Sequence, residues 1–122
     1  MRAPSAFRKL NTKEREIIDA LLAKTFRGRD EIREQINNSL VERAKCECGC
    51  KTINFSTKSI VRVRSKKRIP VEAFYFKGDR PYQILLHIVD GKVSYLEFVS
   101  YSDQVDLEYP KVGALKITVN EK

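Results

Sequence analysis

The apolar residues change their spacing once along the chain, near residue 40, and this change restricts the folds that the sequence can adopt. Before this point they recur every three or four positions, as on one face of an α-helix. After it they alternate with polar residues, as in half-buried β-strands. Because 122 residues give room for one hydrophobic core, we predict a single α+β domain over residues 10–122, preceded by a flexible basic arm over residues 1–9. In this domain an N-terminal helical hairpin packs on a mostly antiparallel β-sheet of about five or six strands.

Two short helices are predicted before the sheet. The first begins after Asn11, whose side chain can cap it, and Glu14 occupies the reciprocal position of a capping box. Glu14 is expected to point away from the apolar face of this helix, which is formed by Ile17, Ile18, Leu21 and Leu22. The second helix follows Gly28 and carries Asp30 and Glu31 in its first turn, where the helix dipole favours acidic side chains.

Several segments after residue 40 carry the strand pattern, and they include residues 40–45, 51–58, 60–64, 71–76 and 115–119. The first two flank a cysteine turn and are expected to form a hairpin. In the third, Arg62 and Arg64 are expected to point outward together, opposite two valines. The last is expected to be an edge strand.

A further hairpin is predicted around Asp90-Gly91, a dipeptide typical of two-residue turns that require positive φ. A regular register through this turn separates the residues of the two strands into two sets. One set is Ile84, Leu86, Ile88, Val93, Tyr95, Val99 and Tyr101, and the other is Leu85, His87, Val89, Ser94, Leu96 and Phe98. Both faces are then largely apolar. Helices can cover one face, so the other is expected to meet a loop, the C-terminal tail or a second subunit, and a homodimer is one prediction.

Three cysteines lie within five residues, at Cys46, Cys48 and Cys50, and could serve as thiolate ligands of one zinc ion. A tetrahedral zinc site needs a fourth ligand, for which His87, Glu47 or a water molecule is available. Two alternatives stay open, since the thiols could instead stabilise a tight turn or form a redox-sensitive disulfide. The cluster cannot staple distant segments together, which fits a reducing compartment.

The formal charge of +8 predicts an anionic partner, and the charges are unevenly distributed. One stretch without acids could contact nucleic acid or another anion, and its basic residues are Lys58, Arg62, Arg64, Lys66, Lys67 and Arg68. A later stretch without bases could contact a basic surface of a partner protein, and its acidic residues are Glu97, Asp103, Asp106 and Glu108.

No enzyme class is indicated by the residue pattern. The chain has one histidine, and the sequence contains no glycine-rich phosphate loop and no Ser/Cys–His–acid order. The N-terminal residues lack the apolar core of a secretory signal, and no apolar run reaches transmembrane length. We therefore expect a cytoplasmic protein without catalytic residues.

The segments 10–16, 26–31 and 33–35 resemble the opening of a group of small uncharacterised bacterial proteins. The same group has a turn similar to Cys48-Gly49-Cys50 and a hairpin similar to residues 85–97. The resemblance extends over most of residues 10–103 and implies a stand-alone domain, of the size common among bacterial immunity, antitoxin and phage-encoded inhibitor proteins. It implies no particular activity or ligand, and the basic stretch after Ser59 departs from the pattern of the group.

These observations favour a non-enzymatic protein-binding module of immunity or inhibitor type, which acts through its polarised charge and an uncovered face of the sheet. One alternative is an accessory protein that binds nucleic acid through its basic stretch. A second alternative is a small structural domain that binds zinc.

Overall fold

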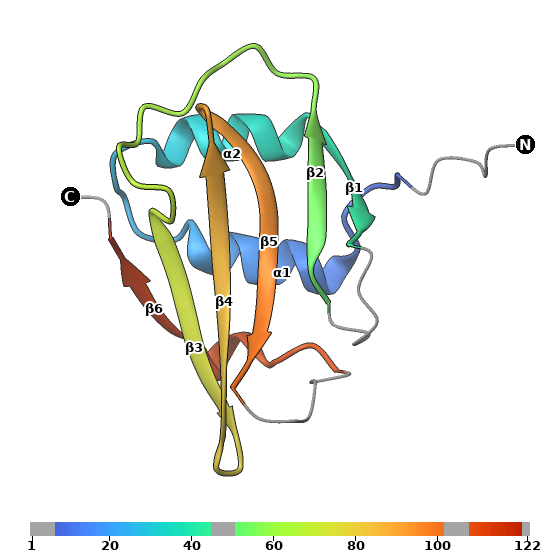
Figure 1. Cartoon of the computed structure of the whole chain (residues 1–122), viewed down its shortest axis with the longest axis vertical. Coiled ribbons are helices and arrows are strands. Elements are labelled where there is room, and N and C mark those ends of the chain that lie inside the picture. The colour runs from blue at the N-terminus through green and yellow to red at the C-terminus, as the bar shows by residue number, and fades with distance from the viewer. Residues whose placement is uncertain (1–6, 45–50, 102–107, 121–122) are drawn as a thin grey trace, which may run out of the picture.

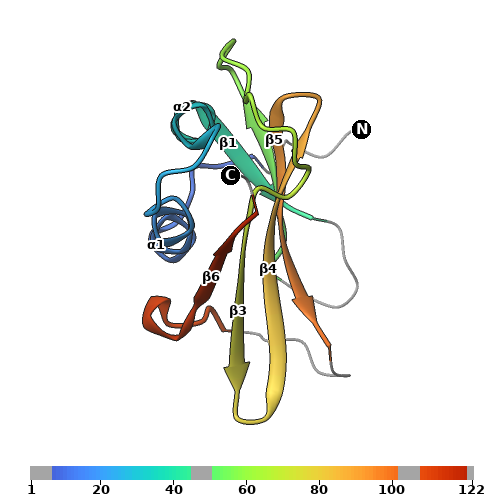
Figure 2. The ribbon, with the colours of Figure 1, turned by 90° about the vertical axis from the view of Figure 1, so that its left-hand side faces the viewer.

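The computed structural model of the chain describes residues 7–44, 51–101 and 108–120. Within them, six antiparallel strands form one sheet, and both helices lie on the same face of it (Figures 1 and 2). The elements in chain order are α1 (Thr12–Leu21), α2 (Arg29–Asn37), β1 (Ser39–Arg43), β2 (Ile53–Thr57), β3 (Val71–Lys77), β4 (Arg80–Val89), β5 (Lys92–Ser100), a short 3-10 helix η1 (Val112–Ala114) and β6 (Lys116–Val119). The α+β class is confirmed, whereas the pairing of the two helices as a hairpin stays a prediction.

The sheet has the strand order β1-β2-β5-β4-β3-β6, so that β1 and β6 are its edges. The edge position predicted for residues 115–119 is confirmed by β6. Residues 7–9 of the predicted arm lie along the other edge, where Arg8 N donates to Val41 O at 2.8 Å and Val41 N donates to Arg8 O at 2.7 Å. Residues 1–6 of the arm lie outside the described residues.

The capping box of α1 is confirmed. Glu14 N donates to Asn11 Oδ1 at 2.8 Å, and Asn11 N donates to Glu14 Oε1 at 2.9 Å. The expectation that Glu14 points away from the apolar face is wrong, because its side chain is fully buried. Arg8 and Tyr109 supply the polar partners that make this burial tolerable.

In the described residues, no helix is long and apolar enough to cross a membrane.

The register predicted for the β4–β5 hairpin is wrong beyond a β-bulge in β5. Ile88 pairs with Val93 as a regular two-residue turn requires, but His87 pairs with Tyr95, so that Ser94 is an extra residue in β5. Beyond the bulge, Leu96 and Phe98 therefore lie on the same face as their partners Leu86 and Ile84, which is the face that the helices cover. Tyr95, Val99 and Tyr101 move to the uncovered face for the same reason.

The strand predicted over residues 60–64 is wrong, because this segment is part of an irregular loop between β2 and β3. Its backbone groups pair with a helix side chain and a turn instead of with a strand. Val61 O accepts a hydrogen bond from Gln35 Nε2 at 2.7 Å, and Val63 N donates to Gly91 O at 2.9 Å. Arg62 and Arg64 consequently do not share a strand face.

Gln35 connects the helix layer, this loop and the sheet. Its side chain is fully buried, although sequence reasoning assigned it no role. Besides Val61 O, Nε2 donates to Gly91 O at 2.8 Å, and Oε1 accepts from Val93 N at 2.7 Å. One side chain thus makes hydrogen bonds to three backbone groups, of which Gly91 O also accepts from Val63 N.

Candidate functional site

The predicted zinc ligands Cys46, Cys48 and Cys50 lie outside the described residues. His87, considered as a fourth ligand, is almost fully buried on β4. Its Nε2 lies 2.9 Å from Glu97 Oε1, and its ring stacks on Tyr95 with a centroid distance of 4.0 Å. Within the described part of the chain, no group of three or more histidine, cysteine or acidic side chains could hold a metal ion.

The structure divides the predicted basic stretch among several partners. Arg62 NH2 donates to Asp90 O at 2.5 Å, and Arg68 NH2 donates to Tyr95 OH at 3.2 Å. Arg64 Nε donates to Glu31 Oε1 at 2.6 Å, and this hydrogen bond holds the pKa of Glu31 below its ordinary value. The three guanidinium groups therefore do not form one patch. Lys66 and Lys67 are exposed on the same loop, and Lys58 lies beyond the end of β2.

The predicted acidic stretch is also divided. Glu97 contacts His87 on the uncovered face of the sheet, and Glu108 Oε2 lies 3.7 Å from Lys77 Nζ. Asp103 and Asp106 lie outside the described residues. The described acids of this stretch thus contact basic or imidazole groups of the chain itself.

Aromatic side chains gather on the face of the sheet that the helices leave uncovered. We call Phe74, Phe76 and Tyr101 the aromatic patch; their exposed fractions are 36%, 55% and 58%. Phe76 pairs with Pro81, and Tyr101 N donates to Pro81 O at 3.3 Å, so the patch lies near the β3–β4 turn. This turn is the far tip of the sheet in Figure 1.

A hydrogen-bonded network restrains Tyr101 of the aromatic patch. The Tyr101 hydroxyl donates to Gln83 Oε1, and Gln83 Nε2 donates to Glu72 Oε1 at 2.7 Å. Asn120 Nδ2, beyond the end of β6, donates to Glu72 Oε2 at 2.8 Å. Because these residues come from β3, β4, β5 and the C-terminal segment, the network fixes the relative positions of four parts of the uncovered face.

Among the exposed basic side chains near the aromatic patch, Lys116 lies on the same face, because it pairs with Phe74 across β3 and β6. Lys77 and Arg80 pair with each other beside the β3–β4 turn and lie on the opposite face, that of Tyr75 and Tyr82. The turn also carries the exposed acid Asp79.

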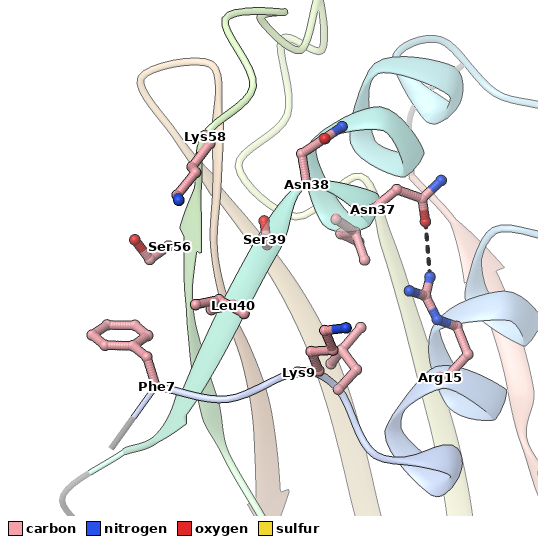
Figure 3. A pocket seen from close by; sticks show the side chains of 11 residues that line it. Phe7, Lys9, Arg15, Asn37, Asn38, Ser39, Leu40, Ser56 and Lys58 are labelled. Carbon is pink, nitrogen blue, oxygen red and sulfur yellow. Dashed lines mark hydrogen bonds between the residues drawn. The ribbon is translucent and has the colours of Figure 1, made fainter. Parts of the chain in front are cut away.

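A second candidate site is a groove of about 700 Å³ at the edge strand β1, which we call the β1 groove (Figure 3). It is bordered by the arm, the end of α2, and strands β1 and β2. Its lining residues are Phe7, Lys9, Leu10, Arg15, Ile36, Asn37, Asn38, Ser39, Leu40, Ser56 and Lys58. Of the predicted site residues only Lys58 lines this groove. The remaining lining residues could not be recognised as a site from the sequence, since they come from four separate segments of the chain.

An ion pair fixes the arm beside this groove. Arg8 donates from NH1 and NH2 to the two carboxylate oxygens of Glu14, at 2.7 and 2.9 Å. Burial raises the pKa of the Glu14 carboxyl, but the hydrogen bonds from Arg8 and from Asn11 N outweigh this effect, so the pKa lies below its ordinary value. The arm and the start of α1 are therefore held together where they form one wall of the groove.

Comparison of the chain with known protein families, with curated proteins and with solved structures finds no match. Its function has to be inferred from its own surfaces.

Proposed function

We propose that this chain is a non-enzymatic protein-binding module of immunity or inhibitor type, and that it contacts a partner protein through the aromatic patch. The observation that carries the proposal is the clustering of three exposed aromatic side chains on the uncovered face of the sheet. Aromatic residues are enriched in the cores of protein interfaces, and contiguous apolar patches commonly mark such interfaces.

Two further properties favour this patch over isolated exposed side chains. The network around Gln83 restrains Tyr101 before a partner arrives, and such preorganisation lowers the entropic cost of binding. Lys116 pairs with Phe74 on the same face, and its charge would attract and orient an acidic group of the partner. A second copy of the chain is the alternative occupant, although its net charge of +8 opposes self-association.

The test is a double substitution, Phe74→Thr with Phe76→Thr, because threonine is compatible with a β-strand but removes both rings. Ile60→Thr is the matched control, since Ile60 is 96% exposed on the β2–β3 loop, away from the patch. Proteins encoded beside the gene for this chain are purified as candidate partners and titrated by calorimetry. The double variant is expected to weaken the complex by about 30-fold or more, as for loss of an interface hot spot.

The control variant is expected to bind like the unchanged chain, and both variants should keep its melting temperature within a few degrees. A complex whose Kd is the same for all three proteins would refute the aromatic patch as the interface. A concentration-dependent dimer in sedimentation, abolished by the double substitution, would assign the patch to a second copy. Binding that disappears after nuclease treatment would favour the nucleic-acid alternative instead.

A further inference from the structure

The lining of the β1 groove favours an anionic ligand. Its basic side chains come from three places, with Lys9 on the arm, Arg15 on α1 and Lys58 after β2. The described residues that line the groove include no acidic side chain. A ligand carrying negative charge would therefore meet cations from several directions without a competing carboxylate.

The C-terminus of α2 also points toward this groove, and a helix C-terminus by itself repels anions. Here its carbonyl groups are already occupied. Gln35 O accepts hydrogen bonds from Ser39 Oγ at 2.5 Å and from Thr57 Oγ1 at 3.0 Å, and Glu34 O accepts one from Asn38 Nδ2 at 2.9 Å. These donors compensate the negative end of the helix, so the cations of the lining decide the sign of the site.

One end of the groove is suited to a phosphate group. Arg15 NH1 donates to Asn37 Oδ1 at 3.0 Å, which leaves Nδ2 of the amide as a donor beside the guanidinium (Figure 3). Lys9 also lines the groove. Guanidinium, ammonium and amide N–H groups are donors that phosphate oxygens accept from in proteins.

The other end offers an apolar surface with polar groups around it. The ring of Phe7 and the side chain of Leu40 are both partly exposed there, and Ser56 and Lys58 lie beside them (Figure 3). A planar aromatic base can stack on such a ring while its edges meet hydroxyl and ammonium groups. The volume of about 700 Å³ lies in the range of small-molecule sites.

We propose that the β1 groove binds a nucleotide, with the base against Phe7 and Leu40 and the phosphate at Lys9, Arg15 and Asn37. The nucleotide can be a free monophosphate or the end of a single strand, since both present a base and a phosphate in the same arrangement. This site lies at the opposite side of the sheet from the aromatic patch and is independent of it.

The experiment is a titration of the full chain with AMP at low ionic strength, followed by amide chemical shifts. AMP is expected to shift the signals of Lys9, Leu40 and Ser56. Adenosine, inorganic phosphate and N-acetylphenylalanine each lack part of the proposed chemistry and are expected to bind at least about 10-fold more weakly. A tetra-adenylate that binds more tightly than AMP assigns the site to the end of a single strand, and one that binds equally or more weakly assigns it to a free nucleotide.

Two substitutions locate the site. Lys9→Ala removes a phosphate contact and Phe7→Ala removes the stacking surface, and each is expected to raise the Kd for AMP about 10-fold. Lys67→Ala is the matched control, because Lys67 is an exposed lysine of the β2–β3 loop outside the groove, and it should change the Kd less than twofold. The proposal is overturned if AMP shifts none of the groove signals at millimolar concentration. It is equally overturned if adenosine, phosphate or N-acetylphenylalanine binds as tightly as AMP, or if Lys9→Ala and Lys67→Ala have equal effects.

Discussion

Removing the Gln35 side-chain amide is expected to destabilise the fold more than any other single polar deletion in α2. The amide is fully buried and makes three hydrogen bonds to backbone groups, at Val61 O, Gly91 O and Val93 N. These groups belong to the β2–β3 loop, the β4–β5 turn and strand β5. Without the amide, Val61 O and Val93 N lose this hydrogen-bond partner, whereas Gly91 O keeps the hydrogen bond from Val63 N.

The size of the effect follows from Val61 O and Val93 N, the two groups that lose this partner while Gly91 O keeps Val63 N. A buried polar group without a partner costs about 1–3 kcal/mol, so Gln35→Met, which keeps the volume but not the hydrogen bonds, is expected to lose about 2–4 kcal/mol. Gln35→Ala also leaves a cavity and is expected to lose about 1–2 kcal/mol more. Since domains of this kind are stable by only about 5–15 kcal/mol, either variant would be close to unfolding.

The assay is urea unfolding followed by circular dichroism, because the chain contains no tryptophan. Glu34→Met is the control, since Glu34 is exposed on the same helix, and it should change the free energy of unfolding by less than about 0.5 kcal/mol. Gln35→Glu adds a pH test. Its buried carboxylate would face two carbonyl oxygens, so its folded pKa should rise and its deficit against the unchanged chain should be largest at pH 7 and shrink as the pH falls. A loss below about 1 kcal/mol for Gln35→Met would refute the reasoning, because it would mean that Val61 O and Val93 N find other partners.

Two further stability predictions concern α1 and the glycines. The folded pKa of Glu14 lies below its usual value of 4.5, so its contribution is present above that pH and is lost as the pH falls through the folded pKa. Glu14→Gln should therefore cost about 1–3 kcal/mol at pH 7 in urea unfolding, and this cost should shrink as the pH falls below 4.5. A cost that does not change with pH would contradict the ion-pair assignment. Gly28 has a φ of 92°, and a Cβ at this position would lie 3.0 Å from Cγ1 of Val63, so Gly28→Ala should lower the free energy of unfolding by about 2 kcal/mol or more. Gly78 has a φ of 64° but open space around it, so Gly78→Ala should lower the free energy of unfolding by about 1 kcal/mol. Gly113→Ala is the control for both, since Gly113 does not have a left-handed φ and no atom lies within 4 Å of a Cβ placed there. Melting temperatures in a different order would contradict this prediction.

The features that could be predicted from the sequence are those set by neighbouring residues. The capping box at Asn11 and Glu14 and the turn at Asp90-Gly91 depend on groups no more than three positions apart, and both are present. The alternation of apolar residues correctly located most of the strands, because it records which side of each strand is buried. The α+β class follows from these local patterns together.

The features that could not be predicted depend on partners that are distant in the sequence. Glu14 is buried because Arg8 and Tyr109 reach it, and Tyr109 lies 95 positions away. The strand expected at residues 60–64 is absent because Gln35 and Gly91 take its backbone groups. Apolar and basic residues do alternate within that segment, but no neighbouring strand was available to pair with it.

The β-bulge at Ser94 had the largest consequence for the candidate site. One extra residue moved Leu96 and Phe98 into the core and turned Tyr95, Val99 and Tyr101 to the uncovered face. The dipeptide at the turn specifies only how β4 and β5 begin to pair, whereas the register beyond it depends on which side chains pack beneath the helices.

The sequence by itself thus determined the order of the helices and most of the strands, the positive charge and the presence of more apolar strand residues than one core requires. Only the tertiary structure decided where the additional apolar residues lie. It formed the aromatic patch from β3 and the residue after β5, and the β1 groove from four separate segments. The physical reason is that turns and caps are interactions of adjacent residues, while a binding surface is made by strands and loops whose pairing is selected by the burial of the whole core.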